Sequence, residues 1–99
     1  MRKPIKWSSF ANADFANLLE YLEFRWNKKV CTDFIENLDY CVYQIEKNPE
    51  LFPFINAELQ IIKCVVTKHN SIFYRETNSR IEIFRLYDTR QNPEDLKFN

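Results

Sequence analysis

The fold is decided by three stretches, LQIIKCVVT (59–67), IFYRE (72–76) and RIEIFRLYD (80–88). All three are rich in Ile, Val, Phe and Tyr, the residue types that favour extended backbone in a sheet. The polar triplets His69-Asn70-Ser71 and Thr77-Asn78-Ser79 separate them, and such short polar links are typical of hairpin turns. We therefore predict three consecutive antiparallel strands.

The last of these strands carries apolar residues on both of its predicted faces. Strict alternation divides it into Ile81, Ile83, Arg85 and Tyr87 on one face and Glu82, Phe84, Leu86 and Asp88 on the other. A sheet that is covered by helices on one side has no need of apolar residues on the other. We therefore expect a tail or a partner to cover the second face.

The residues before the sheet carry a first helical pattern. Ile5, Lys6 and Trp7 form a short β-prone run, and the Ser8 hydroxyl can then cap a helix that starts near Ser9. Its apolar stripe recurs every three or four positions and consists of Ala11, Phe15, Leu18, Leu22 and Trp26. The polar side that we expect to face solvent consists of Asp14, Glu20, Glu23 and Arg25.

A second helical pattern follows almost at once. Asn27 interrupts the first stripe, and Asn48-Pro49 stops the second, because a residue before proline disfavours helical backbone. The second stripe consists of Val30, Phe34, Leu38, Cys41 or Val42, and Ile45. A link this short predicts an antiparallel two-helix hairpin. Residues 49–56, with two prolines, read as an apolar loop.

The predicted fold class is therefore α+β: a short N-terminal strand, an antiparallel two-helix hairpin and a three-stranded antiparallel C-terminal sheet. A chain of 99 residues has the size of one domain, which we assign to residues 1–99. No apolar run is long enough to span a membrane, so we expect a cytoplasmic protein with no membrane partner.

Composition removes several classes of function. The 14 basic and 14 acidic residues balance, so no net charge draws the chain to nucleic acid. The absence of glycine excludes glycine-dependent phosphate loops and the Gly-x-Ser-x-Gly nucleophile elbow. Asparagine is the next most tolerant residue where φ must be positive, and asparagines stand at the predicted segment ends: Asn27, Asn48, Asn56, Asn70 and Asn78.

The three cysteines do not suggest a metal site. Cys31, Cys41 and Cys64 leave one thiol over in any disulfide scheme and lack the close Cys-x-x-Cys spacing of zinc ligands. We expect reduced cysteines that pack as small hydrophobic residues. No metal and no cofactor is predicted.

The basic residues of the sheet half are the main candidates for a site. They are interleaved with Tyr74 and Tyr87 and consist of Lys63, Lys68, Arg75, Arg80, Arg85 and Arg90. Arginine forks bind phosphate, and tyrosine stacks on bases or moves a proton, so this pattern suits RNA. The alternative is that cross-strand pairs with Glu76, Glu82 and Asp88 neutralise the arginines.

A set of short motifs resembles a known family over nearly the whole chain. In the first half the motifs are Ile5-Lys6-Trp7-Ser8, Ala11, Asp14-Phe15, Tyr21-Leu22, Trp26-Asn27, Phe34-Ile35, Leu38, Ile45, Asn48-Pro49 and Phe52-Pro53. In the second half they are Ile72-Phe73-Tyr74-Arg75, Ile81-Glu82-Ile83 and Asp88-Thr89-Arg90-Gln91-Asn92-Pro93. Their order and spacing resemble the RelE/ParE superfamily of bacterial toxins, the toxic halves of type II toxin–antitoxin pairs.

The resemblance implies a bacterial protein that arrests growth when it is alone. A cognate antitoxin protein would silence it by laying a helical or extended segment over the apolar second face of the sheet. The superfamily has two branches. RelE-like members cut messenger RNA in the ribosome, whereas ParE-like members bind and poison DNA gyrase.

The same resemblance favours the ParE-like branch. RelE-like RNases place lysines and arginines on the middle strands, where this chain carries Ile62, Cys64 and Ser71. The long helical hairpin also resembles ParE. We therefore predict inhibition of DNA gyrase without catalysis. The predicted target-binding residues are Arg90, Arg85, Tyr87 and Arg75.

Two alternatives stay open. In the first, the chain is a ribosome-dependent mRNA endoribonuclease, and Tyr74 or His69 moves protons. Its catalytic residues would then be Lys63, Lys68, Arg75 and Arg90. In the second alternative, the chain is a relative without toxicity.

Overall fold

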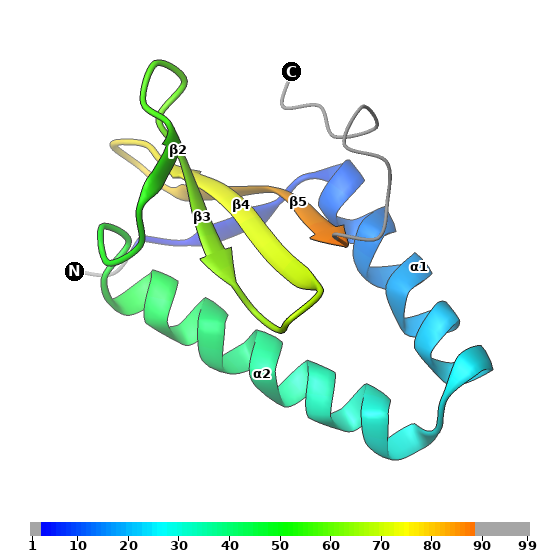
Figure 1. The fold of residues 1–99 in the computed structure, drawn as a ribbon. Helices are drawn as coiled ribbons and strands as arrows, with labels where there is room; N and C mark the ends of the chain where they lie inside the picture. Colours follow the sequence, from blue (N-terminus) through cyan, green and yellow to red (C-terminus); the bar gives the residue numbers. More distant parts are fainter. Residues whose placement is uncertain (1–2, 89–99) are drawn as a thin grey trace.

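The computed structural model describes residues 3–88. In chain order, two long helices follow the first strand and precede the other strands (Figure 1). The described elements are β1 (Ile5–Trp7), α1 (Ser9–Arg25), α2 (Lys28–Lys47), β2 (Phe54–Asn56), β3 (Ile61–Val65), β4 (Asn70–Glu76) and β5 (Ile81–Asp88). The α+β class, both helices and the antiparallel β3–β4–β5 meander are confirmed.

The sheet is larger than the sequence indicates. It has five strands in the order β1-β5-β4-β3-β2, and β1 pairs with β5 in parallel, so the prediction of three antiparallel strands was incomplete. The apolar loop was partly wrong, because its residues Phe54–Asn56 form the edge strand β2. Pro53, which directly precedes this edge strand, has no N–H to donate, but its carbonyl accepts a hydrogen bond from the Lys63 N–H at 3.2 Å.

Side chains cap the start of both helices. The Ser8 hydroxyl accepts from the Ala11 N–H at 3.0 Å, which confirms the predicted cap of α1. Asn27, which was expected only to interrupt the first stripe, caps α2: its side chain accepts from the Val30 N–H at 3.1 Å. Ser8 also ties the start of α1 to the sheet, because its hydroxyl donates to the Phe84 carbonyl at 2.6 Å. None of the predicted asparagines has a positive φ among residues 3–88, where Gln60 alone takes one (57°).

One apolar core holds the two helices against one face of the sheet. The predicted α2 stripe is confirmed, since Phe34, Leu38, Cys41 and Ile45 are buried with Ile62, Cys64 and Ile72 from the strands. The α1 stripe ends earlier than predicted. Trp26 is 60% exposed, and it is the C-cap of α1, just before the turn to α2.

A bulge in β5 overturns the predicted division of its faces. Tyr74 pairs with Ile83 and Phe73 pairs with Arg85, so Phe84 is an extra residue. Alternation restarts after it, and Leu86 joins Ile81 and Ile83 in the core under the helices.

Neither α1 nor α2, the helices within residues 3–88, has the length and apolar composition of a membrane-spanning helix.

Candidate functional site

The face of the sheet that the helices leave uncovered has a small apolar centre. Ile61, Phe73 and Tyr87 are buried there, and Phe84 packs against them. The rings of Phe73 and Tyr87 lie 5.9 Å apart at an interplanar angle of 56°. We call this side the open face; it consists of this apolar centre and the flanking charged residues Lys63, Arg75, Arg80 and Glu82.

Two arginines of the open face share one carboxylate. Arg75 Nη2 donates to Glu82 Oε1 at 3.1 Å, and Arg80 binds Glu82 Oε2 through Nε at 2.9 Å and Nη2 at 2.6 Å. Hydrogen bonds from Arg80 and then from Arg75 hold the pKa of the Glu82 carboxyl below its ordinary value. The cluster therefore stays ionised near neutral pH, with an excess of one positive charge.

An aromatic ring completes this cluster. The guanidinium carbon of Arg75 lies 5.1 Å from the centre of the Phe84 ring, within the range of a cation–π contact. Arg75 Nε is buried and has no hydrogen-bond partner among the described residues. The ring and Glu82 together fix the Arg75 side chain across the open face.

A second arginine site lies beyond the bulge and is largely buried. Arg85 Nε donates to Asp14 Oδ2 at 2.7 Å and Arg85 Nη2 donates to Asp14 Oδ1 at 3.0 Å. The Leu86 N–H adds a third bond to Asp14 Oδ2 at 3.0 Å. The expectation that Asp14 faces solvent was therefore wrong: its partners lie 71 and 72 residues away in sequence.

The other predicted target-binding residues lie in different settings. Tyr87 is buried against Phe73, whereas Arg75 and Arg85 bind different carboxylates. Arg90 lies outside the described residues.

Two residues of the RNase alternative, Lys63 and Arg75, lie on the same face of the sheet, whereas Lys68 lies outside the strands. Lys63 is half-buried on β3, and Lys68 is exposed in the turn that follows. Tyr74 is fully buried, its hydroxyl donates to the Pro49 carbonyl at 2.7 Å, and burial is the largest of the effects that raise its pKa. His69 lines an apolar hollow of about 370 Å³ beside Trp26 and Phe34.

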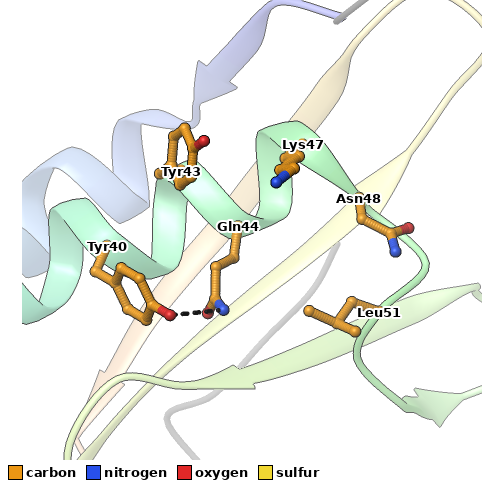
Figure 2. Close-up of a pocket in the computed structure, with 6 residues that line it drawn as sticks. All are labelled: Tyr40, Tyr43, Gln44, Lys47, Asn48 and Leu51. Atoms are coloured by element: carbon orange, nitrogen blue, oxygen red, sulfur yellow. Dashed lines mark hydrogen bonds between the residues drawn. The ribbon is translucent and has the colours of Figure 1, made fainter.

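A further hollow of about 440 Å³ lies along α2 and the loop after it. Figure 2 shows its lining residues, Tyr40, Tyr43, Gln44, Lys47, Asn48 and Leu51. Gln44 Nε2 donates to the Tyr40 hydroxyl at 3.2 Å. No carboxylate or histidine lines it, and no group of three or more metal-ligating side chains occurs among the described residues.

Two features of the site escaped sequence reasoning. The pairing of Arg75 with Glu82 belongs to the cross-strand alternative and is confirmed, since these residues face each other in register. The second arginine on Glu82 and the Asp14–Arg85 pair were missed. The sequence carried only one signal for the latter, an acidic residue within the quoted Asp14-Phe15 motif.

No protein-family model matches the sequence, and no curated protein does either. Solved structures do match. The chromosomal ParDE toxin–antitoxin system of P. aeruginosa contains a chain with 12% sequence identity and a TM-score of 0.74, over 88% of this chain and 96% of that one. The fold is that of the RelE/ParE toxins.

Other structures with the RelE/ParE fold agree. The YoeB/ParE toxin from Agrobacterium tumefaciens has 11% identity and a TM-score of 0.64, over 86% of this chain and 96% of that one. YafQ in the E. coli DinJ–YafQ toxin–antitoxin complex has 12% identity and a TM-score of 0.62, over 91% of this chain and 96% of that one. The resemblance seen in the motifs is thus confirmed at the level of the fold.

Proposed function

We propose that this protein is the toxin of a bacterial type II toxin–antitoxin pair and that it arrests growth by binding DNA gyrase in the cytoplasm. The RelE/ParE fold supports the toxin role. The ParDE likeness, with a higher TM-score than the YoeB and YafQ structures described above, supports the ParE-like branch.

The observation that carries the choice of target is the state of the sheet arginines. Arg75 and Arg80 are bound to Glu82, and Arg85 is bound to Asp14. An RNase active site needs cationic groups aimed at the phosphate and a group that can exchange a proton there. The carboxylates occupy the arginines instead, which favours a surface that binds a protein.

The target-binding surface that we propose is the open face and the segment that follows β5. Arg75 and Arg90 contact gyrase, and Tyr87 supports the apolar centre beneath Arg75. Arg85 acts as a positioning residue, because its bonds to Asp14 fix the end of β5 against α1. The cognate antitoxin covers the same open face with a helical or extended segment.

The RNase alternative keeps one specific support. Lys63 lies on β3 beside Phe73 of β4, on the side of the sheet that carries Arg75, and it forms no ion pair among residues 3–88. Such a lysine can approach a scissile phosphate. In this reading Lys63 and Lys68 bind RNA and Arg90 stabilises the developing charge.

The test is brief induction of the chain in bacteria that lack the antitoxin. Plasmid supercoiling and the 5′ ends of messenger RNA are measured in the same culture within minutes. We expect arrest with altered supercoiling and no new 5′ ends, and we expect Arg90→Ala to relieve it while Lys68→Ala does not. New ends in phase with codons would establish the RNase instead, and normal growth would indicate a relative without toxicity.

A further inference from the structure

Two cysteines from different layers of the molecule meet in the core. Cys41 lies on α2 and Cys64 lies on β3, and both are buried. Their sulfur atoms lie 3.6 Å and 4.0 Å from the same oxygen, the carbonyl of Val65. The two sulfur atoms therefore converge on one carbonyl at the boundary between helix and sheet.

The third cysteine offers an internal comparison. Cys31 is on the same helix as Cys41 and is equally buried in the same core cluster. Among the described residues, its thiol does not share the contact with the Val65 carbonyl that Cys41 and Cys64 make. Burial alone therefore does not distinguish the pair; the shared carbonyl does.

The pair is chemically asymmetric. Hydrogen bonding with the neighbouring Cys64 thiol lowers the pKa of the Cys41 thiol against the opposing effect of burial. The same hydrogen bond and burial raise the pKa of the Cys64 thiol. Since the thiolate is the reactive form, Cys41 is the residue that reacts first and Cys64 the residue that follows.

We propose that Cys41 and Cys64 form a modification site, a dithiol that hydrogen peroxide converts to a reversible intrachain disulfide. The Cys41 thiolate attacks one peroxide oxygen, the O–O bond breaks, and sulfenic acid and hydroxide form. The Cys64 thiol then attacks the Cys41 sulfur. The S–S bond forms, the S–O bond breaks, and the departing hydroxide takes the Cys64 proton as water. Two thiols and one peroxide yield one disulfide and two waters.

The bond would join α2 to β3 across the core. Figure 1 shows the connection that it would close, which runs from the end of α2 through β2 to β3. A crosslink over this connection restricts the unfolded chain and keeps the helix on the sheet. Hydrogen peroxide is close to water in size. We therefore choose it as the oxidant for two buried thiols, which larger disulfide reagents reach poorly.

The experiment treats the purified full-length chain with hydrogen peroxide, under native conditions and in denaturant, and maps the products by peptide mass. We expect the native protein to lose two hydrogens, to give a Cys41–Cys64 linked peptide, and to retain only the Cys31 thiol. The oxidised protein unfolds at a higher temperature, and a dithiol reductant reverses both changes. Cys31→Ser is the matched control and forms the same disulfide.

Three results would overturn the proposal. One is sulfinic acid on Cys41 with the Cys64 thiol intact. Another is a disulfide that includes Cys31 in the native protein. The third is a native protein that keeps all of its thiols at a peroxide concentration that oxidises the denatured chain. Because the peptide map is made on the unaltered sequence, these outcomes do not depend on whether Cys41→Ser or Cys64→Ser folds.

Discussion

Two arginine sites lie on either side of the Phe84 bulge and differ in how far they are removed from water. Before the bulge, Glu82 holds Arg75 and Arg80, whose side chains are 39% and 42% exposed. After it, Asp14 holds Arg85, and these two side chains are 12% and 13% exposed. The charged side chains before the bulge are thus partly in water, whereas Arg85 after it is held against α1.

The comparison separates two roles for the same residue type. A buried charge that loses its partner destabilises a protein strongly, whereas exposed pairs contribute little. The Asp14–Arg85 pair is thus part of what holds α1 on β5. The Arg75–Glu82–Arg80 cluster contributes little to the fold, which leaves it available for a partner.

The largest effect should come from Asp14→Ala. The change leaves the Arg85 guanidinium and the Leu86 N–H without their acceptor in a largely buried place, at a cost of about 3 kcal/mol in the free energy of unfolding. Urea denaturation measures it. Asp33→Ala is the matched control, because Asp33 forms an exposed pair with Lys29 on α2 and should cost no more than about 0.5 kcal/mol. Equal costs for the two variants would refute the structural role of Asp14.

A smaller effect is expected for Arg85→Lys. Lysine keeps the charge but cannot bind both carboxylate oxygens of Asp14 as the arginine fork does, so we expect a loss of about 1–2 kcal/mol. The same exchange at the half-exposed Arg75 should cost less than about 0.5 kcal/mol. Denaturation curves of both variants measure the two losses of stability. A larger loss for Arg75→Lys than for Arg85→Lys would show that the structural role was assigned to the wrong arginine.

Arg75→Ala should reduce toxicity while changing the stability of the fold only slightly. Its removal changes the free energy of unfolding by less than about 1 kcal/mol, because the ion pair is partly in water. If Arg75 contacts the target, binding weakens by about tenfold, the equivalent of about 1.4 kcal/mol. Growth after induction is compared with that of cells expressing Lys29→Ala, a change far from the sheet. Full toxicity in a folded Arg75→Ala protein would remove this residue from the binding surface.

The smallest effect concerns pH. Folding lowers the pKa of the Glu82 carboxyl. The contribution of the ionised carboxylate to the free energy of unfolding is therefore complete above the ordinary glutamate pKa of about 4.3, and it is lost as the pH falls through the pKa of the folded state. The stability of Glu82→Gln should therefore decline less steeply than that of the wild type below about pH 4. Thermal unfolding across this range tests it, and parallel curves would mean that the two arginines do not stabilise the carboxylate.

Local patterns predicted the parts of the fold that local forces determine. The α2 stripe and the Ser8 cap were readable because their partners lie within a few residues. The parallel pairing of β1 with β5 was not, since a strand of three residues carries no signal for a partner at the other end of the chain.

The candidate site was harder to predict for the same reason. Periodicity placed Asp14 in solvent, and only the folded chain brings Arg85 to it. The bulge also has no local signature in the sequence, because Phe84 fits the regular alternation of its strand. Only the pairing with β4 shows that Phe84 is an extra residue. Arg75 and Glu82 were accessible to reasoning because hairpin neighbours meet in register.

The most direct test of the central claim is a supercoiling assay with purified gyrase, relaxed plasmid and this protein, with and without Arg90→Ala and Arg75→Ala. We predict that the wild-type chain inhibits supercoiling at a concentration at which both variants are weaker. Full gyrase activity at saturating toxin, together with cleavage of messenger RNA on translating ribosomes, would contradict the account and assign the open face to RNA.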